Sequence, residues 1–156
     1  MGEHHPAVTP REAQDLAERV ASSMFARDRA SQALGMRIVA VAPGRAQLAM
    51  RVRADMLNGH RTCHGGFIFS LADSAFAFAC NSYNLITVAS GCTIEFVAPA
   101  REDDVLTATA QERSVSGRTG VYDIEVTNQA GAAIAFFRGK SYRIKGHVLD
   151  DAASGG

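Results

Sequence analysis

The stretch NGHRTCHGGFIFSLAD, residues 58–73, carries most of the information in this 156-residue chain. A polar, glycine-containing loop leads directly into an apolar segment that runs from Phe67 to Cys80. That segment is apolar around nearly its whole circumference, which is typical of a helix buried in a core. It contains one carboxylate, Asp73, and an unpaired carboxylate in an apolar setting costs free energy. We therefore expect Asp73 to be catalytic.

The few polar residues of this segment gather on one side of the expected helix. Ser70, Asp73, Ser74 and Asn81 stand at i, i+3, i+4 and i+11, which places them along one stripe. The stripe predicts that one flank of the helix is not filled by the protein's own apolar core.

Composition limits the class of protein. The chain has 16 basic and 16 acidic residues, and a net charge of zero gives no indication of nucleic-acid binding. The longest apolar run, Phe67 to Cys80, is shorter than the roughly 20 residues that a membrane span needs, so we expect no membrane partner. No signal peptide is recognised near Met1. Three cysteines without a CxxC pair favour a reduced, cytoplasmic protein.

The length predicts a single domain, which we place at residues 11–147 between flexible tails at 1–10 and 148–156. A helix is expected to begin after Thr9, because Thr9, Pro10 and Glu12 have the spacing of a capping box with proline at the first helical position.

Strand patterns flank the apolar helix on both sides. Two strands precede it and three or four meandering strands follow it, which predicts an α+β fold with an antiparallel sheet wrapped around one long buried helix. The predicted strands cover residues 38–41, 45–53, 87–97, 104–114, 118–128 and 132–144.

Several short motifs resemble one known family. The chain is similar to hotdog-fold thioesterases of the PaaI type, associated with phenylacetic acid degradation, over residues 31–146. The matching segments are Met56–His60, Cys63–Gly66, Ser70–Asp73, Cys92–Phe96, Leu106–Ala110, Gly120–Asp123 and Arg138–Ser141. A lone His-Gly-Gly would be a weak signal, but a carboxylate eight residues after Gly65 makes the match specific.

The resemblance implies roles for individual residues. Asp73 would act as nucleophile or general base, and the Gly65 amide would donate to the oxyanion. Asn58 and His64 would place the thioester and water. Some relatives use a Ser or Thr early in the strand after the helix; Ser90 stands one position out of register here, so we leave it out of the catalytic set. The implied substrate is an aryl-acyl or hydroxylated aryl-acetyl coenzyme A thioester, and we expect no cofactor and no metal.

The implied chemistry fits these residue types. Thioester hydrolysis builds negative charge on the carbonyl oxygen, and loss of one preorganised donor costs about 2.7–4 kcal/mol of barrier in well-studied enzymes. The Gly65 amide, at the expected start of the helix, has no intrahelical partner and allows a close approach. Gly66 is assigned to substrate binding beside it.

The spacing of Gly65 and Asp73 has a geometric consequence. Eight residues of helix span roughly 12 Å, so the two groups of one chain cannot both reach one carbonyl carbon. An antiparallel helix from a second copy would bring Asp73 opposite the partner's Gly65. We therefore predict a site shared across a twofold dimer, and the resemblance extends this to a dimer of dimers.

Arg138 and Lys140 lie on one face of the last predicted strand. They are assigned to the phosphates of coenzyme A. Alternatively, Arg138 and Lys140 are ordinary charged residues that face solvent at the end of a strand.

Other readings of the loop stay open. Asn58 with Gly59 can form only a turn, and His64 can serve only to orient the loop. His60, Cys63 and His64 can ligate zinc, although no fourth ligand stands at a suitable spacing. Cys63 can act as a thiol nucleophile beside His64.

Two alternative functions use the same scaffold. One is a non-catalytic binder of acyl-coenzyme A or an aromatic ligand. The other is a hydratase or dehydratase, which would call for a catalytic histidine; the residue five positions after Asp73 is Phe78 instead.

Overall fold

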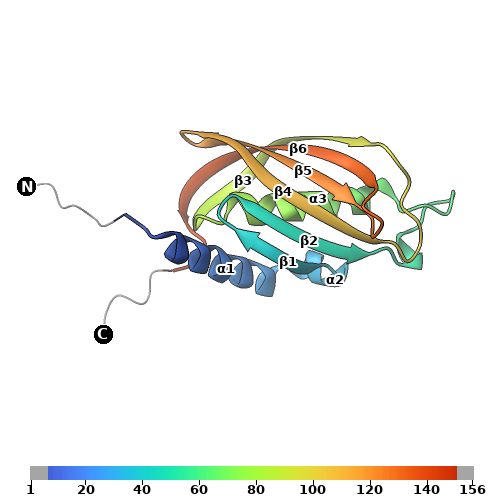
Figure 1. Ribbon diagram of the computed structural model, residues 1–156, viewed down its shortest axis with the longest axis horizontal. Helices are drawn as coiled ribbons and strands as arrows, with labels where there is room; N and C mark the ends of the chain where they lie inside the picture. Colours follow the sequence, from blue (N-terminus) through green and yellow to red (C-terminus); the bar gives the residue numbers. More distant parts are fainter. Residues whose placement is uncertain (1–6, 151–156) are drawn as a thin grey trace, which may run out of the picture.

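The computed structural model describes residues 7–150. The described chain contains three α-helices, a short 3-10 turn and six strands. Figure 1 shows that the helices and strands form one body. In chain order the elements are α1 (Pro10–Arg27), α2 (Arg29–Ala33), β1 (Arg37–Ala42), β2 (Arg45–Arg51), the 3-10 turn η1 (Ala54–Met56), α3 (Gly65–Cys80), β3 (Leu85–Phe96), β4 (Val105–Ser116), β5 (Thr119–Thr127) and β6 (Ala133–His147).

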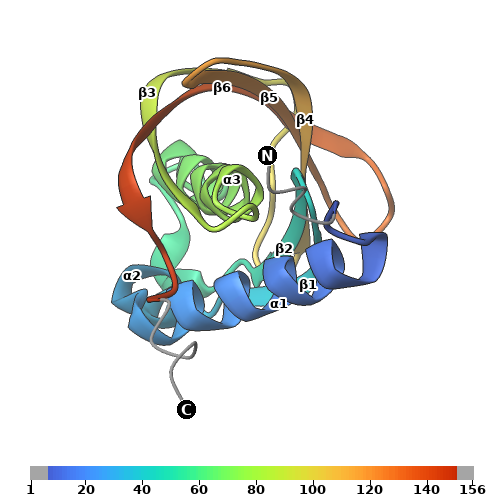
Figure 2. The same ribbon diagram turned by 90° about the vertical axis from the view of Figure 1, so that its left-hand side faces the viewer.

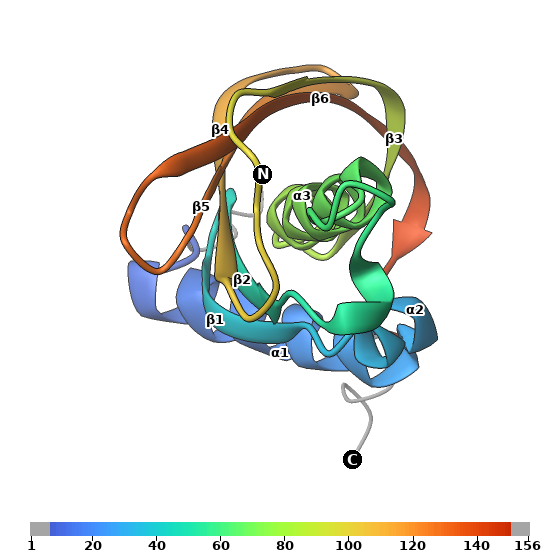
Figure 3. The ribbon, with the colours of Figure 1, turned by 90° about the vertical axis from the view of Figure 1, so that its right-hand side faces the viewer.

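The six strands form one antiparallel sheet in the order β1-β2-β4-β5-β6-β3. Seen along α3, the sheet curls around this helix, while α1 lies below β1 and β2 and α2 lies below α3 (Figures 2 and 3). The predicted antiparallel sheet wrapped around one long buried helix is therefore the observed architecture.

The strongest local predictions are confirmed. The Thr9 side chain accepts a hydrogen bond from the Glu12 amide, and the Glu12 carboxylate accepts one from the Thr9 amide, so the capping box is present. The apolar positions of the alternating strands are buried, as expected for residues that face a helix. These positions include Ala46, Leu48 and Met50 in β2 with Val52 just after it, Leu106, Ala108 and Ala110 in β4, and Tyr122, Ile124 and Val126 in β5.

Of the three or four meandering strands predicted after the helix, three form a meander, and β3 is the strand that does not. After α3 the chain does not enter the strand next to β4; β3 pairs with β6, at the far edge of the sheet. Only β4, β5 and β6 form a meander. Local periodicity specifies that a segment is a strand, but its partner is set by long-range packing of the sheet around α3.

α3 packs its apolar faces into this curled sheet. Phe76 lies against Tyr122 and Phe137, with ring centroids 5.5 and 6.1 Å apart. Gly139 makes room for that ring, because a Cβ there would lie 2.8 Å from it. The fit fixes the axial position and rotation of α3 relative to the sheet.

One stripe of α3 is left uncovered. Its residues Gly66, Ser70, Asp73 and Ala77 are half-buried or exposed and stand at i, i+4, i+7 and i+11, whereas most other residues of the helix are buried. The predicted polar stripe was thus right for Ser70 and Asp73.

The other two polar residues of the predicted stripe have protein partners. Ser74 turns toward α2, where its hydroxyl oxygen lies 3.0 Å from that of Ser31. Asn81 is buried and exchanges hydrogen bonds with the backbone of Thr87.

The ends of the chain are described only in part. Within the predicted C-terminal tail, the amides of Val148 and Leu149 donate to the backbone and side-chain oxygens of Asn84. Pro10, at the end of the predicted N-terminal tail, is the first residue of α1. Residues 1–6 and 151–156 of the predicted tails lie outside the described residues. Among the helices that are described, none is long and apolar enough to cross a membrane.

Candidate active site

Gly65 is the first residue of α3, and its amide is free to donate. Within residues 7–150 this N–H has no hydrogen-bond acceptor. As the first amide of a 16-residue helix it carries part of the positive end of the helix dipole. A side chain would be crowded here, because a Cβ on Gly65 would lie 3.0 Å from the Phe96 ring, which would have to shift.

His64 is the N-cap of the helix. Its imidazole Nδ1 accepts a hydrogen bond of 2.9 Å from the Gly66 amide. A neutral histidine that accepts at Nδ1 carries its proton on Nε2. This Nε2–H is a hydrogen-bond donor that points away from the cap. This bond holds the imidazole at the start of the helix and leaves Nε2 available to substrate or water, and both readings of His64 stay predictions.

Asn58 organises the loop before the helix. Its side-chain oxygen accepts hydrogen bonds from the amides of His60 and Thr62, at 2.9 and 3.2 Å, and its Nδ2 donates to the Thr62 hydroxyl. The backbone amide of Asn58 also donates to the Thr62 carbonyl. The loop is therefore closed on itself around Asn58, which presents Arg61 in a left-handed conformation at its tip.

Asp73 lies on the uncovered stripe, two turns of helix from Gly65. Within the described part of the chain its carboxylate has no hydrogen-bond donor and no salt-bridge partner. Burial raises the pKa of Asp73 above the ordinary value of 3.8. The structural alternative, a carboxylate paired with neighbouring backbone or with Asn81, is not what the structure shows.

Cys92 of β3 faces the same region. Burial raises the pKa of its thiol, and the negative charge of Asp73 raises it further. Asp73 therefore lies near the inner side of the edge strand as well as on the uncovered stripe.

Cys63 does not have the character of a nucleophile. Burial raises the pKa of its thiol to about 11, so it is protonated at neutral pH. Its sulfur donates a weak hydrogen bond to the His64 carbonyl rather than pairing with the imidazole. For the zinc alternative, no group of three or more His, Cys, Asp or Glu residues between 7 and 150 is arranged to hold a metal ion.

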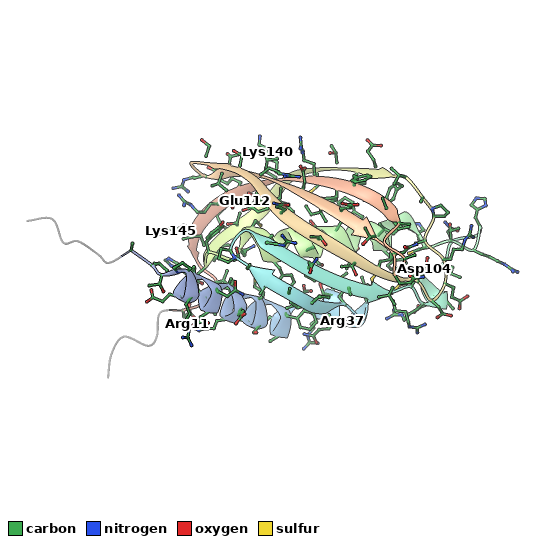
Figure 4. The ribbon with its side chains drawn as sticks, in the orientation of Figure 1. Arg11, Arg37, Asp104, Glu112, Lys140 and Lys145 are labelled. Carbon is green, nitrogen blue, oxygen red and sulfur yellow. The ribbon has the colours of Figure 1, made fainter. Side chains whose placement is uncertain are left out.

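Arg138 and Lys140 are not brought together with Gly65 and Asp73 in the single chain. Both are exposed on the side of β6 that faces away from α3, and Figure 4 places Lys140 on the outside of the sheet. Arg138 forms a two-point ion pair with Asp123, with contacts of 2.7 and 2.9 Å. Their assignment to coenzyme A phosphates stays a prediction.

Ser90 occupies a β-bulge. The pairing of β3 with β6 shifts register between Ala89 and Gly91, and the Ser90 hydroxyl donates to the Lys140 carbonyl. Bulges redirect side chains locally, so the Ser90 side chain does not follow the alternation of a regular strand.

The sequence analysis missed Phe96 as a neighbour of the site. Phe96 is the last residue of β3 and its ring covers Gly65, yet it is 52% exposed. Its position in a terminal strand segment gave no local signal; only the folding of β3 alongside α3 brings the two together.

This fold and site define a class. The family model of the Thioesterase superfamily matches residues 60–135, which contain the loop after Asn58, all of α3 and the edge strand. With the relatives described next, this shows that the chain belongs to the thioesterase superfamily, with its hotdog fold.

Within the superfamily the chain is similar to PaaI proteins. It is 52% identical over 132 residues to the acyl-coenzyme A thioesterase PaaI of Escherichia coli K12, covering 85% of this chain and 94% of that one. The structure of the E. coli PaaI protein superposes with a TM-score of 0.86 at 51% identity, over 86% of this chain and 98% of that chain. A mutant structure of PaaI from Thermus thermophilus gives a TM-score of 0.72 at 40% identity, over 75% and 100%.

Proposed function

We propose that this protein hydrolyses acyl-coenzyme A thioesters, with phenylacetyl-like or hydroxylated aryl-acyl groups as the favoured acyl part. The observation that carries the proposal is the pairing of roles on α3: a free amide at Gly65 and a desolvated, unpaired carboxylate at Asp73. The name of the E. coli relative supports the coenzyme A ester. The aryl preference rests on family likeness alone.

The reaction uses a base and an oxyanion donor. Asp73 takes a proton from water while the water oxygen attacks the thioester carbonyl carbon, and the Gly65 amide donates to the oxygen as it becomes negative. Collapse of this intermediate breaks the C–S bond. The proton held by Asp73 passes to the sulfur, so coenzyme A leaves as the thiol. Alternatively Asp73 attacks the carbon itself, forming a mixed anhydride that water then hydrolyses. Single-turnover hydrolysis in ¹⁸O-water tests the second route, since label enters the carboxylate when water attacks the Asp73 carbon of the anhydride.

We propose further that each site is shared by two chains. Gly65 and Asp73 stand about 12 Å apart along one helix. The uncovered stripe of α3 runs beside β3, a 12-residue edge strand that pairs with β6 alone in the described chain and bears one charge, Glu95. Long edges of this kind favour pairing with another chain. A twofold axis that joins two β3 edges places the α3 stripes side by side and antiparallel.

Two such dimers are expected to assemble into a tetramer in the cytoplasm. This part of the proposal rests on family likeness and on the reduced state expected of three free cysteines. Light scattering coupled to size-exclusion chromatography measures the mass directly. A monomeric active enzyme would contradict the shared site.

A panel of acyl-coenzyme A esters tests the activity. We expect thiol release, followed with a thiol reagent, from aryl-acyl esters at micromolar enzyme or below. If no aryl or short-chain ester is turned over, the proposal is wrong. Tight ester binding without thiol release, unchanged in Asp73→Ala, would instead identify the non-catalytic binder, and addition or loss of water across a carbon-carbon double bond would identify the hydratase or dehydratase.

A further inference from the structure

Three hydrogen-bonded side chains tie α3 to the junction of α1 and α2, directly beside Asp73. Ser74, the residue after Asp73, has its hydroxyl oxygen 3.0 Å from that of Ser31 in α2. The Ser31 hydroxyl also lies 2.6 Å from the carboxylate of Asp28, which accepts the Ser31 amide at 2.9 Å. Ser31 is 2% exposed, so this network of Ser74, Ser31 and Asp28 lies mostly inside the protein.

The direction of the hydrogen bonds follows from their chemistry. An ionised carboxylate can only accept, so the Ser31 hydroxyl donates its proton to Asp28. The Ser31 oxygen then accepts, and the Ser74 hydroxyl is the donor. A serine inside a helix can bond to the carbonyl four residues earlier, as Ser70 does with Gly66. Ser74 is directed toward another helix, so its hydroxyl joins two elements of the fold.

The network lies on one flank of the stripe that carries Asp73. Successive residues of a helix are about 100° apart around its axis, so Ser74 lies about 100° to one side of Asp73. Phe76, three residues after Asp73, lies about 60° to the other side. The sheet holds Phe76, whose ring lies over Gly139 and beside Phe137. Asp73 therefore stands between a polar contact with α2 and an aromatic contact with the sheet.

The Asp73 carboxylate has no such contact of its own. Among the described residues no salt-bridge partner holds it, and burial is the one cause of its raised pKa. The place of this carboxylate in the site is thus set by the rotation of α3. Alignment of the reacting groups matters strongly, because a displacement of about 1 Å can cost about 10²-fold in rate.

The two contacts between α3 and the α1–α2 junction differ in kind. Phe25 of α1 packs its ring against Phe78, one turn after Ser74, with ring centroids 6.4 Å apart. Apolar packing of this sort is not directional, so it tolerates small rotations of the helix. A hydrogen bond requires a narrow range of length and angle. The hydroxyl of Ser74 is therefore the group at this junction that defines the rotation of α3.

We propose that Ser74 is a positioning residue for Asp73, and that Ser31 and Asp28 hold it in place. The inference rests on the proposed hydrolysis of coenzyme A esters by Asp73. In this assignment the junction of α1 and α2 aligns the carboxylate with the thioester carbonyl, and it acts through the rotation of α3 rather than on the substrate.

The test compares kcat with KM in variants that each remove one hydroxyl. We expect Ser74→Ala and Ser31→Ala to lower kcat for phenylacetyl-coenzyme A by about tenfold, at a temperature well below unfolding. KM should change by less than about twofold, because the groups that bind the substrate are untouched. Ser74→Thr keeps the donor hydroxyl and should return kcat to within about threefold of the wild type. The double alanine variant should lose no more than about tenfold, since both hydroxyls belong to one contact.

Ser82→Ala is the matched control. Ser82 is 1% exposed and follows the end of α3, where its hydroxyl donates to the Ala79 carbonyl and accepts from the Gly44 amide. This variant also removes a buried serine that joins α3 to another element, but at a distance from Asp73. It should lower the melting temperature at least as much as Ser74→Ala does and leave kcat unchanged.

Three results would overturn the inference. An unchanged kcat in Ser74→Ala and Ser31→Ala would mean that the position of Asp73 does not depend on this network. An equal loss of kcat in Ser82→Ala would make the effect a general consequence of lower stability. A loss in Ser74→Ala with wild-type kcat in Ser31→Ala would give Ser74 a role independent of α2. All three need an active wild type, whereas a wild type that cleaves no coenzyme A ester would contradict the proposed function itself, so the two failures are distinguishable.

Discussion

The Nδ1 atom of His64 lies 2.9 Å from the amide nitrogen of Gly66 and accepts its hydrogen bond. This contact fixes the first turn of α3, and with it the direction in which the neighbouring Gly65 amide points.

Replacement of His64 separates capping from chemistry. His64→Ala should destabilise the protein by about 1 kcal/mol, the usual value of an N-cap. His64→Asn should restore most of that stability, because asparagine is a favoured N-cap. Thermal unfolding measures the contribution of the cap to stability, and kcat measures the contribution of His64 to catalysis. If His64→Asn recovers stability but remains slow, the Nε2 proton takes part in catalysis; recovery of both would limit His64 to orienting the loop.

Removal of the Asp73 charge should abolish most of the activity. We expect Asp73→Asn to lower kcat by a factor of about 10² to 10⁴, the usual value of a general base, with a much smaller change in KM. The control is Asp103→Asn, an exposed carboxylate at positive φ, where asparagine fits the backbone as well as aspartate does. A drop below about tenfold in Asp73→Asn would move the base elsewhere.

The same variant should be more stable than the wild type at neutral pH. Burial raises the pKa of Asp73 in the folded state, so its charged form opposes folding, and stability falls as the pH rises through that pKa. Asparagine carries no charge at any pH. The gain in melting temperature of Asp73→Asn should therefore be largest near pH 7 and should shrink as the pH falls toward the ordinary pKa of 3.8, because the uncharged form of Asp73 gains weight there. A gain that is the same at both pH values would have another cause.

Complementation tests whether Gly65 and Asp73 of different chains meet. Asp73→Ala and Gly65→Pro should each be inactive as homo-oligomers, the second because proline has no N–H to donate. A co-expressed mixed dimer should regain about half of the wild-type activity, since one of its two sites is intact. Mixed dimers that form and stay inactive would contradict the shared site.

Gly65→Ala is the control for that experiment. It keeps the N–H but adds a Cβ that would lie 3.0 Å from the Phe96 ring. It should retain more activity than Gly65→Pro, and equal inactivity of the two variants would mean that the clash with Phe96, not the lost donor, disables the proline variant.

Much of the fold was predictable because the signals are local. The alternation of Ala46, Leu48, Met50 and Val52 specified a strand with one buried face, and the Thr9 and Glu12 spacing specified a helix start. The continuous apolar run before Cys80 specified a buried helix. Each of these patterns depends on the geometry of one element, so neighbouring residues suffice to determine it.

The candidate site was predictable only along one helix. The loop after Asn58, the glycine at the helix start and the lone carboxylate at Asp73 are close in sequence, so their spacing could be converted into distances. The pairing of β3 with β6, the Phe96 ring on Gly65 and the outward direction of Arg138 join segments far apart in the chain.

The sequence by itself therefore determined the elements, the buried face of each, and the chemistry that α3 presents. Tertiary structure decided which strand lies at the edge, which face of β6 meets water, and which ring lies next to Gly65. The physical reason is that hydrogen-bond pairing and side-chain packing between strands depend on how the whole sheet curls around α3, and no local pattern records that arrangement.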